Sequence, residues 1–306
     1  MYDLIIIGAS AAGLSASVYA ARRRLNFKII TADIGGEVAT SGEIENWPGI
    51  IHTNGIELAD QFKKHAQANK VVIEDGKWVG DIRKEDNIFL ILGKNGDGSA
   101  FEEKAKAILV ATGVHPRELN IPGEKEFRNK GVSYCTVCDG PLFGGQVVAV
   151  IGGGNSSLES ALMMADIASK VYLINKNSYF KGEQVLIDKV SQNPNIEIIY
   201  EAMTTAILGE KFVNKVEYKN KSGQIHKLDV AGVFVHIGQI PNSSFAPGLD
   251  LDEIKQIKVN MRGETNILGL YAAGDVTNIP YKQIVIAAGQ GVAALLSVVD
   301  YLNKNH

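Results

Sequence analysis

The segment "YDLIIIGASAAGLSASVYAARR", Tyr2–Arg23, predicts a strand, a glycine-rich turn and a helix in that order. The strand is expected over Asp3–Ile7, where the residues are almost all β-branched or aliphatic, and the helix should continue to about Arg24. A second apolar stretch, Phe27–Thr31, follows a short polar break and predicts the next strand. Strand, helix and strand at this spacing indicate a βαβ unit with parallel strands.

The turn in this unit has the spacing of a dinucleotide-binding sequence. Gly8, Ser10 and Gly13 occupy the three positions of G-x-G-x-x-G, with serine where the backbone must approach a pyrophosphate. That pyrophosphate would lie at the N-terminus of the helix. Asp33 lies about two residues beyond the position expected for a ribose-binding acid. Taken alone, this pattern is a weak indication of a nucleotide site.

The pattern recurs in the middle of the chain, in "QVVAVIGGGNSSLESALMMADIASKVYLIN", Gln146–Asn175. Here the expected elements are a strand at Val147–Ile151, a helix at about Asn155–Ala168 and a strand at Val171–Ile174. Two such units in one chain are far more specific than either alone. We therefore predict an α/β protein with two Rossmann-like, three-layer nucleotide-binding domains.

The second unit indicates which nucleotide it takes. Gly152, Gly154 and Ser157 match the turn spacing, and the second strand ends at Asn175 and Lys176 rather than at an acid. An acid there would bind the ribose diol of NAD, whereas lysine supplies a charge suited to a 2′-phosphate. The sequence therefore favours NADPH over NADH.

Both ends of the chain contribute to the first domain. "AKAILVATGVHP", Ala105–Pro116, predicts a buried strand that ends in a Thr-Gly turn, and Asp275 follows another strand in a Gly-Asp turn. The apolar run Ile284–Val299 contains Gly289, Gln290 and Gly291, so we interpret it as a core helix. The second domain must then be inserted into the first. We expect first-domain segments at 1–115 and 242–306 and an inserted domain at 116–241.

Within these domains, two stretches alternate apolar and polar residues and predict antiparallel strands. One runs over residues 73–110, and the other over Glu201–Val235 with a turn at Ser222-Gly223. A further helix is expected from about Gly55 to Asn69, after a bent loop. We interpret both stretches as antiparallel additions to the two domains.

Composition narrows the class of protein. The net charge is −3 and there is no block of lysine or arginine, so a nucleic-acid partner is not expected. Leu4–Ala21 carries no charge, but Asp3 precedes it and much of it is Gly, Ser and Ala, which argues against an export signal or a membrane span. We therefore expect a cytoplasmic protein without a membrane partner. In that compartment a close cysteine pair is catalytic or metal-binding more often than structural.

The cysteines of this chain, Cys135 and Cys138, lie in "GVSYCTVCDG" between the two nucleotide units. A zinc site needs about four ligands, and the histidines show no ligand spacing, so we predict no metal. A thioredoxin-like module would require neither two dinucleotide turns nor this length. Two inert buried thiols remain an alternative, although the Gly-Pro turn that follows favours a helix start that would activate a thiol. A nicotinamide gives a hydride, a disulfide takes two electrons, and a flavin converts one into the other. Two nucleotide sites and one close cysteine pair are the parts that such an electron relay requires.

At this point the sequence resembles the low-molecular-weight thioredoxin reductases of bacteria and archaea from Tyr2 to about Val299. The landmarks "GASAAG", "GGE…ENWPG", "ATG", "CTVCDG", "GGGNSSLES", "AAGDV" and "YKQ" appear in that family's order. The resemblance implies FAD as cofactor, NADPH as co-substrate, thioredoxin or a thioredoxin-like protein as partner, and a homodimer. It also implies that the inserted domain rotates about linkers near residues 114–122 and 237–243. The Cys-x-x-Cys-Asp sequence argues against a flavin-bound regulatory protein without turnover.

The resemblance assigns roles residue by residue. Cys138 would face the flavin and form a thiolate–flavin pair, Cys135 would attack the partner's disulfide, and Asp139 would manage the thiol protons. The FAD site would comprise Gly8, Ser10, Ala11, Ala12, Gly13, Thr31, Asp33, Gly35, Gly36, Glu37, Asn46, Thr112, Gly113, Gly274, Asp275, Lys282, Gln283 and Ile284. The NADPH site would comprise Gly152, Gly153, Gly154, Asn155, Ser156, Ser157, Glu159, Asn175, Lys176 and Lys181.

The chain departs from the family's pattern at three places. Ser10 replaces a glycine and Glu37 replaces a glutamine. Around the 2′-phosphate, a His-Arg-Arg run followed by arginine becomes Asn175, Lys176, Asn177 and Lys181, which removes the bidentate arginine forks. The electron donor could then be NADH, ferredoxin or another reductant instead of NADPH, and a peroxidase-system protein could replace thioredoxin.

Overall fold

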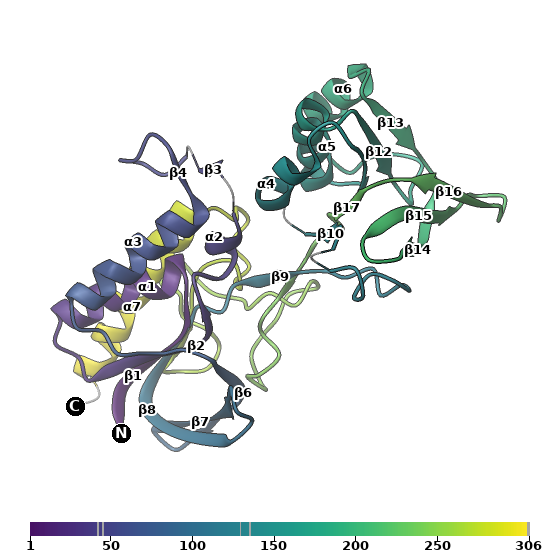
Figure 1. The fold of residues 1–306 in the computed structure, drawn as a ribbon. Helices are drawn as coiled ribbons and strands as arrows, with labels where there is room; N and C mark the ends of the chain where they lie inside the picture. Colours follow the sequence, from purple (N-terminus) through teal and green to yellow (C-terminus); the bar gives the residue numbers. More distant parts are fainter. Residues whose placement is uncertain (42, 45, 129, 135, 305–306) are drawn as a thin grey trace. The chain divides into compact units, whose positions relative to one another are not determined.

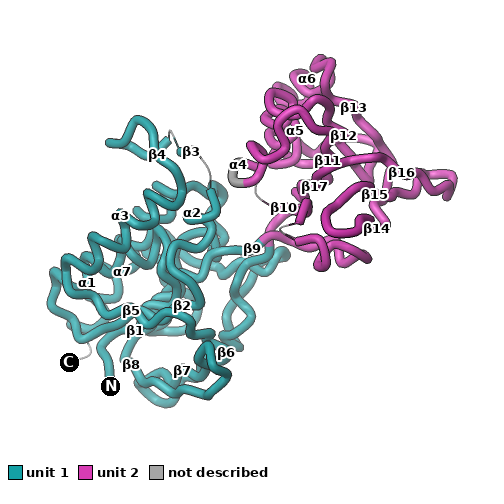
Figure 2. The backbone as a smooth tube through the Cα atoms, viewed as in Figure 1, with its two compact units in different colours: residues 1–115, 240–306 teal, residues 116–239 magenta. Residues whose placement is uncertain are grey.

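The chain divides into two compact units, coloured separately in Figure 2. The computed structural model describes residues 1–41, 43–44, 46–128, 130–134 and 136–304. Unit 1 consists of Met1–His115 and Ile240–His306, and unit 2 consists of Pro116–Gln239. Both contain parallel strands and helices, as expected for an α/β protein with one nucleotide-binding domain inserted into another.

The main sheet of unit 1 has the strand order β5-β2-β1-β8-β7-β6, and β19 also pairs with β8. Its strands are β1 (Tyr2–Ala9), β2 (Phe27–Ile34), β5 (Ile73–Glu74), β6 (Lys77–Glu85), β7 (Ile88–Asn95), β8 (Ala100–Val110) and β19 (Leu270–Ala272). β5, β2, β1, β8 and β19 run parallel, whereas β6, β7 and β8 are antiparallel neighbours. The carboxyl ends of the parallel strands therefore share one edge, and the turn after β1 lies there.

Helices cover one face of this sheet (Figure 1). They are α1 (Ala11–Arg22), α3 (Gly55–Ala68) and α7 (Ile284–Lys304), with the short α2 (Gly36–Thr40) and the hairpin β3 (Glu43–Ile44)–β4 (Thr53–Asn54) between β2 and α3. Leu4 and Ile6 of β1 face the helical layer, while Ile5 and Ile7 face the layer that contains Phe89. Burial on both faces explains why this strand is a continuous apolar run.

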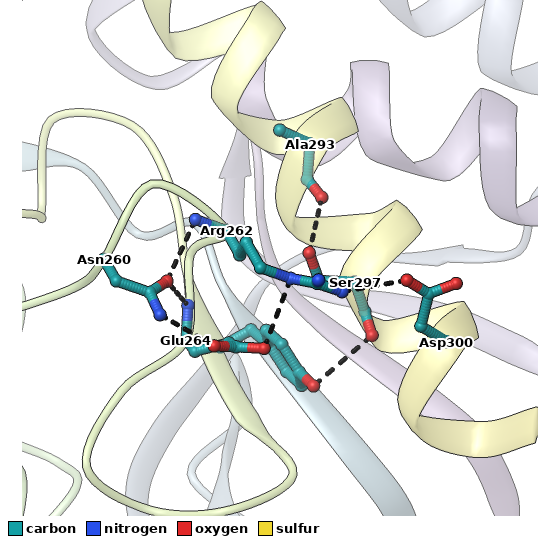
Figure 3. A network of polar contacts seen from close by, with 7 residues as sticks. Asn260, Arg262, Glu264, Ala293, Ser297 and Asp300 are labelled. Atoms are coloured by element: carbon teal, nitrogen blue, oxygen red, sulfur yellow. Dashed lines mark hydrogen bonds and ion pairs between the residues drawn. The ribbon is translucent and has the colours of Figure 1, made fainter. Parts of the chain in front are cut away.

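Helix α7 is fixed to unit 1 by packing and by a polar network. By length and composition α7 would qualify as a membrane span within the described chain, but one face of it is buried against α1. Arg262 reaches Asp300 of α7 through Nη2 at 2.8 Å and Glu264 through Nε at 3.4 Å (Figure 3). The Tyr271 hydroxyl donates to the Ser297 carbonyl, and burial raises the pKa of Tyr271 to about 12. The packing matches the predicted core helix.

Unit 2 is built around a second parallel sheet, in the order β10-β17-β11-β12-β13. Its strands are β10 (Val132–Ser133), β11 (Val147–Ile151), β12 (Lys170–Ile174), β13 (Ile196–Ile199) and β17 (Gly232–Val235). Its helices are α4 (Thr136–Asp139), the 3₁₀ turn η1 (Gly140–Phe143), α5 (Asn155–Ile167) and α6 (Gln184–Gln192). α5 and α6 lie over one face of the sheet (Figure 1).

An antiparallel sheet packs on the face of the parallel sheet opposite α5 and α6, where the second buried cluster of unit 2 lies. It consists of β14 (Met203–Gly209), β15 (Val213–Lys219) and β16 (Ile225–Asp229), and Gly223 has a φ of +85° in the predicted turn. The prediction that antiparallel strands continue to Val235 was wrong, because β17 returns to the parallel sheet between β10 and β11. The short apolar run of β17 could equally have suited either sheet.

The two connections between the units pair with each other. β9 (Val114–Pro116) leaves unit 1 and β18 (Gln239–Pro241) returns to it, and the two form a small sheet. The Arg117 amide also donates to the Gly238 carbonyl at 2.9 Å. The chain therefore enters and leaves the inserted unit at adjacent positions.

Candidate functional site

The turn after β1 requires glycine at two of its positions. Gly8 has a φ of +107°, and a Cβ there would lie 2.3 Å from the Ala111 carbonyl oxygen. A Cβ on Gly13 would lie 1.9 Å from the Gly8 carbonyl oxygen. The turn can therefore close, and α1 can pack on β1, only without side chains at these positions.

Ser10 replaces the middle glycine without blocking the turn. Its hydroxyl donates to the Gly35 carbonyl and thereby points toward the loop after β2. Ser10 is the N-cap of α1, but its side chain caps no backbone N–H group. The first N–H groups of α1, from Ala11 to Gly13, therefore lack a side-chain cap, which is the arrangement that a pyrophosphate needs.

The loop after β2 folds back against this turn. The Thr31 hydroxyl accepts a hydrogen bond from the Ala9 amide and donates to the Asp33 carbonyl. One carboxylate oxygen of Asp33 accepts from the Gly36 amide at 3.0 Å. Asp33 therefore stabilises the loop at Gly35–Gly36 while its side chain remains exposed at the edge of the site.

Segments far apart in the sequence meet at the same place. Asn46 Nδ2 donates to Gln283 Oε1 at 3.2 Å, and a Cβ on Gly274 would lie 3.1 Å from the Cβ of Ala12. Ile284, next to Gln283, is the first residue of α7. The turn, the loop after β2 and both C-terminal segments predicted for FAD thus belong to one region of unit 1.

Partly desolvated charges lie in this region. Burial raises the pKa of the Asp275 carboxyl, with Lys282 opposing the shift, and burial lowers the pKa of Lys282. Lys282 Nζ also donates to the Thr277 carbonyl. Desolvation raises the pKa of Glu37, although its side chain keeps contact with solvent. Glu37 is thus more easily protonated than an ordinary glutamate, as suits a position where the resembling family has a neutral amide.

Thr112 and Gly113 lie where the connections leave unit 1. The Thr112 hydroxyl donates to the Asn242 carbonyl at 2.6 Å, and the Asn242 side-chain amide donates to the Thr112 carbonyl at 2.9 Å. The Asn242 amide donates to the Gly113 carbonyl at 3.0 Å, and Asn242 Oδ1 lies 2.6 Å from His115 Nδ1. Asn242, which sequence reasoning did not select, therefore joins the two connections at their base.

The second turn, in unit 2, has the same construction. Gly152 has a φ of +154°, and a Cβ there would lie 2.1 Å from the His236 carbonyl oxygen. Gly154 is the N-cap of α5, again without a side-chain cap, and its carbonyl accepts from the Ser157 hydroxyl at 2.7 Å. Ser157 is buried, while Ser156 and Glu159 are exposed on α5. The uncapped start of α5 thus fits a second pyrophosphate.

The loop after β12 packs closely against this turn. A Cβ on Gly153 would lie 2.6 Å from Asn175 Oδ1, and the Lys181 amide donates to the Gly153 carbonyl at 2.7 Å. Asn155 Oδ1 accepts from the Glu183 amide at 2.7 Å, and Asn155 Nδ2 donates to the Glu183 carboxylate at 3.2 Å. The loop therefore has a fixed position beside the glycines.

The three residues predicted for the 2′-phosphate differ in access. Asn175 is 1% exposed, and its amide binds its own loop, donating to the Tyr179 carbonyl and accepting from the Asn177 amide. Lys176 and Lys181 are exposed, and the described residues include no ion-pair partner for either. Only the two lysines therefore present a free charge to a ligand.

The predicted redox segment follows a tyrosine that is anchored within unit 2. Cys135 lies outside the described residues; Cys138 and Asp139 belong to α4, which is a single turn followed by η1, shorter than the predicted helix start suggested. Before it, the Tyr134 hydroxyl donates to the buried Glu124 carboxylate at 2.8 Å. Burial and this hydrogen bond raise the pKa of Tyr134.

Thr136 of this segment meets two further polar residues, Ser160 and His236, and sequence reasoning selected none of the three. Thr136 Oγ1 lies 2.7 Å from His236 Nε2 and also contacts Ser160 Oγ. Burial lowers the pKa of His236 to about 4, so its imidazole is neutral at neutral pH. The one signal was a histidine directly after an apolar strand, in a segment that we interpreted as a linker.

Comparisons with known proteins agree with this architecture. Residues 2–291 match the model of a family described as pyridine nucleotide-disulphide oxidoreductase. The chain is 39% identical, over 98% of its length, to an alkyl hydroperoxide reductase protein of Escherichia coli strain K12, and it spans 58% of that relative's length. The Lactococcus lactis thioredoxin reductase structure aligns with a TM-score of 0.85 at 31% identity, covering 99% of this chain and 100% of that one. The T. acidophilum thioredoxin reductase aligns with a TM-score of 0.81 at 36% identity, covering 100% and 99%.

Proposed function

Because the chain belongs to the pyridine nucleotide-disulphide oxidoreductase family, we propose that it is a flavoprotein disulfide reductase. Family membership implies FAD and a pyridine nucleotide. In our proposal, two electrons pass from NADPH through FAD to the Cys135–Cys138 pair and then to the disulfide of thioredoxin or a thioredoxin-like protein. The enzyme works in the cytoplasm, as a homodimer.

Unit 1 holds the FAD in this proposal. The uncapped N-terminus of α1 binds the pyrophosphate, with Ser10 turned aside toward Gly35. Asp275 and the Asn46–Gln283 pair face the rest of the cofactor. When bound, FAD supplies the conversion between a two-electron hydride donor and a disulfide acceptor.

The protein's own chemistry takes place at the cysteines. Two electrons and two protons convert the Cys135–Cys138 disulfide into two thiols. The Cys135 thiolate then attacks the partner's disulfide, which forms a mixed disulfide and releases one partner thiolate. Cys138 attacks the sulfur of Cys135, which restores the internal disulfide and releases the second partner thiolate. Asp139, next to Cys138, accepts and returns the thiol protons.

One observation carries this proposal. Thr136, between the two cysteines, is bound within unit 2 to Ser160 of α5, the helix that begins at the second nucleotide turn. The redox segment and the pyridine-nucleotide turn are therefore parts of one body. Both must be delivered to a flavin, which is consistent with a unit that moves about the paired connections β9 and β18.

The free lysines support a phosphorylated donor. Lys176 and Lys181 are exposed, whereas Asn175 is buried and its amide is used within its own loop. Two single lysine charges attract a 2′-phosphate but do not clamp it as an arginine fork would. We therefore propose NADPH as donor with weak discrimination against NADH. Ferredoxin or another reductant is the alternative donor.

The similarity to alkyl hydroperoxide reductase supports a second candidate partner. In that case the protein would reduce a disulfide in a peroxidase system rather than thioredoxin. The thiol exchange would be the same, so the cysteine roles do not depend on this choice. Turnover with a purified thioredoxin and with a purified peroxiredoxin, compared at equal concentrations, distinguishes the two partners.

An anaerobic reductant titration tests the proposal. The flavin-loaded protein is mixed in turn with NADPH, NADH and reduced ferredoxin while the flavin absorbance is followed. We expect rapid bleaching by NADPH, slower bleaching by NADH and none by ferredoxin. The variant Lys176→Ala/Lys181→Ala should need a higher NADPH concentration for half-maximal rate, with the NADH dependence unchanged.

Each contrary outcome removes a different part of the proposal. Reduction by ferredoxin alone would replace the donor and keep the enzyme. Equal effects of the lysine substitutions on NADPH and NADH would remove the 2′-phosphate assignment. A protein that neither contains nor takes up FAD would contradict the enzyme itself.

A further inference from the structure

A buried hydroxyl of the redox segment lies between an imidazole and a second hydroxyl. Thr136 Oγ1 is 2.7 Å from His236 Nε2 and also hydrogen-bonds Ser160 Oγ. Thr136 and Ser160 are each 4% exposed, so the two side chains must satisfy their hydrogen bonds inside the protein. Thr136 is the residue directly after Cys135 and two before Cys138.

The same histidine is fixed at its backbone to the second nucleotide turn. Its amide donates to the Ile151 carbonyl at 2.8 Å, as the continuation of β17 beside β11. Its carbonyl oxygen occupies the space that a Cβ on Gly152 would need. His236 therefore connects the Gly152 turn, through its backbone, with the redox segment, through its ring.

The hydrogen bonds in this group form an ordered chain. A neutral imidazole has one ring N–H, and Thr136 has a single hydroxyl proton. Thr136 therefore donates to one neighbour and accepts from the other, and the direction of the whole chain follows from the histidine tautomer. Because the Thr136 hydroxyl lies between His236 and Ser160, removal of the imidazole leaves it with only Ser160.

We propose that His236 is a positioning residue for the Cys135–Cys138 pair, acting through the Thr136 hydroxyl. This inference rests on the proposed function and goes beyond it. The anchored hydroxyl holds the residues between the two cysteines against α5. It thereby limits how far the two cysteines can separate, and it raises the effective concentration of each thiol for the other. Without the Thr136–His236 hydrogen bond, the equilibrium between disulfide and dithiol shifts toward the dithiol.

Matched substitutions test this role. Glutamine at position 236 places an amide where Nε2 lies, whereas asparagine, one methylene shorter, does not reach Thr136. The pair His236→Gln and His236→Asn therefore differs in the hydrogen bond and little else. Thr136→Ser and Thr136→Val form a second pair, with and without the hydroxyl.

The measurement is the equilibrium between dithiol and disulfide in glutathione buffers of defined ratio, read by thiol labelling of the flavin-loaded full chain. We expect His236→Asn and Thr136→Val to lower the equilibrium constant for disulfide formation about three- to tenfold, the size of one neutral hydrogen bond. His236→Gln and Thr136→Ser should match the wild type. The double variant His236→Asn/Thr136→Val should shift no further than Thr136→Val alone.

The outcomes separate this inference from the proposed function. A wild-type protein without a reversible dithiol–disulfide couple would contradict the proposed function. If the wild type has this couple and all four variants share its equilibrium constant for disulfide formation, the positioning role alone would be overturned. Equal shifts in His236→Gln and His236→Asn would also overturn it, because packing and not the hydrogen bond would then be the cause.

Discussion

Single residues explain how this chain tolerates its departures from a standard dinucleotide turn. Ser10 keeps the turn open because its hydroxyl is bound to Gly35 rather than to the first amides of α1. Ser157 occupies the third glycine position of the second turn and is bound to Gly154. In both turns the serine hydroxyl bonds a carbonyl, which leaves helix N–H groups to a ligand.

The two cysteines should differ in their effects on the flavin. We expect Cys135→Ser to retain flavin reduction by the donor and to lose disulfide turnover. Cys138→Ser should also lose turnover, and any long-wavelength thiolate–flavin absorbance of the wild type should vanish with it. The measurement is the visible spectrum of each variant together with turnover. A band that persists in Cys138→Ser would reverse the two roles.

His236 should make the protein sensitive to acid. Its pKa is lowered to about 4 in the folded chain, whereas an unfolded histidine titrates near 6.5. Between these values the unfolded chain binds more protons, so the histidine's contribution to stability is complete above about pH 6.5 and is lost on acidification. Denaturant unfolding at about pH 7 and about pH 5 should show the wild type losing about 1–2 kcal/mol more than His236→Gln. Equal losses would contradict this linkage.

The sequence allowed some residue-level predictions and not others. Turn glycines such as Gly8 follow from the spacing, because no other residue permits so close a backbone approach. The burial of Asn175 and the partners of His236 could not be predicted, since they depend on loops and strands that meet only in the folded unit. A single sequence carries no periodic signal for such contacts.

At the scale of elements, strands and helices with a strong pattern were predicted closely. The strand at Val147–Ile151 has the predicted bounds, and the helix predicted at about Gly55–Asn69 is α3, Gly55–Ala68. β17 was assigned to the wrong sheet, because four buried residues carry no alternation that distinguishes parallel from antiparallel pairing. The brevity of α4 was also missed.

The contact between α1 and α7 should depend on one glycine. A Cβ on Gly291 would lie 2.1 Å from the Ala12 carbonyl oxygen, whereas a Cβ on the exposed Gly289 would have no neighbour within 4 Å. Gly291→Ala should therefore lower the free energy of unfolding by about 1–3 kcal/mol. Gly289→Ala on the same helix should raise it by about 0.5–1 kcal/mol.

Denaturant midpoints of both variants check this prediction. Equal denaturant midpoints for Gly291→Ala and the wild type would mean that α7 can move away from α1 without a loss of stability. The flavin content of Gly291→Ala is a second readout, because Ala12 belongs to the turn proposed to bind FAD.

At the scale of the whole molecule, the paired connections make a removal experiment practical. Neighbouring strands lie about 4.8 Å apart, so the ends of β9 and β18 can be joined by a few residues. We expect a chain with residues 117–238 replaced by a short Gly-Ser linker to fold, bind FAD and lack disulfide reductase activity. Its visible spectrum and flavin content are the measurement.

The complementary piece is the control. Pro116–Gln239 is one continuous segment with its own buried clusters, so it should unfold cooperatively and remain colourless. A colourless, unfolded linked chain would contradict the proposal that unit 1 alone holds the flavin.

The packing of α7 on α1 has a consequence for synthesis on the ribosome. The N-terminal strands emerge early, but the helix that covers α1 is translated only after all of Pro116–Gln239. The inserted segment can therefore complete its core while the first segment still waits for its missing layer. A nascent chain stalled at about residue 280, before α7, should protect the middle of the sequence from protease, and not its beginning.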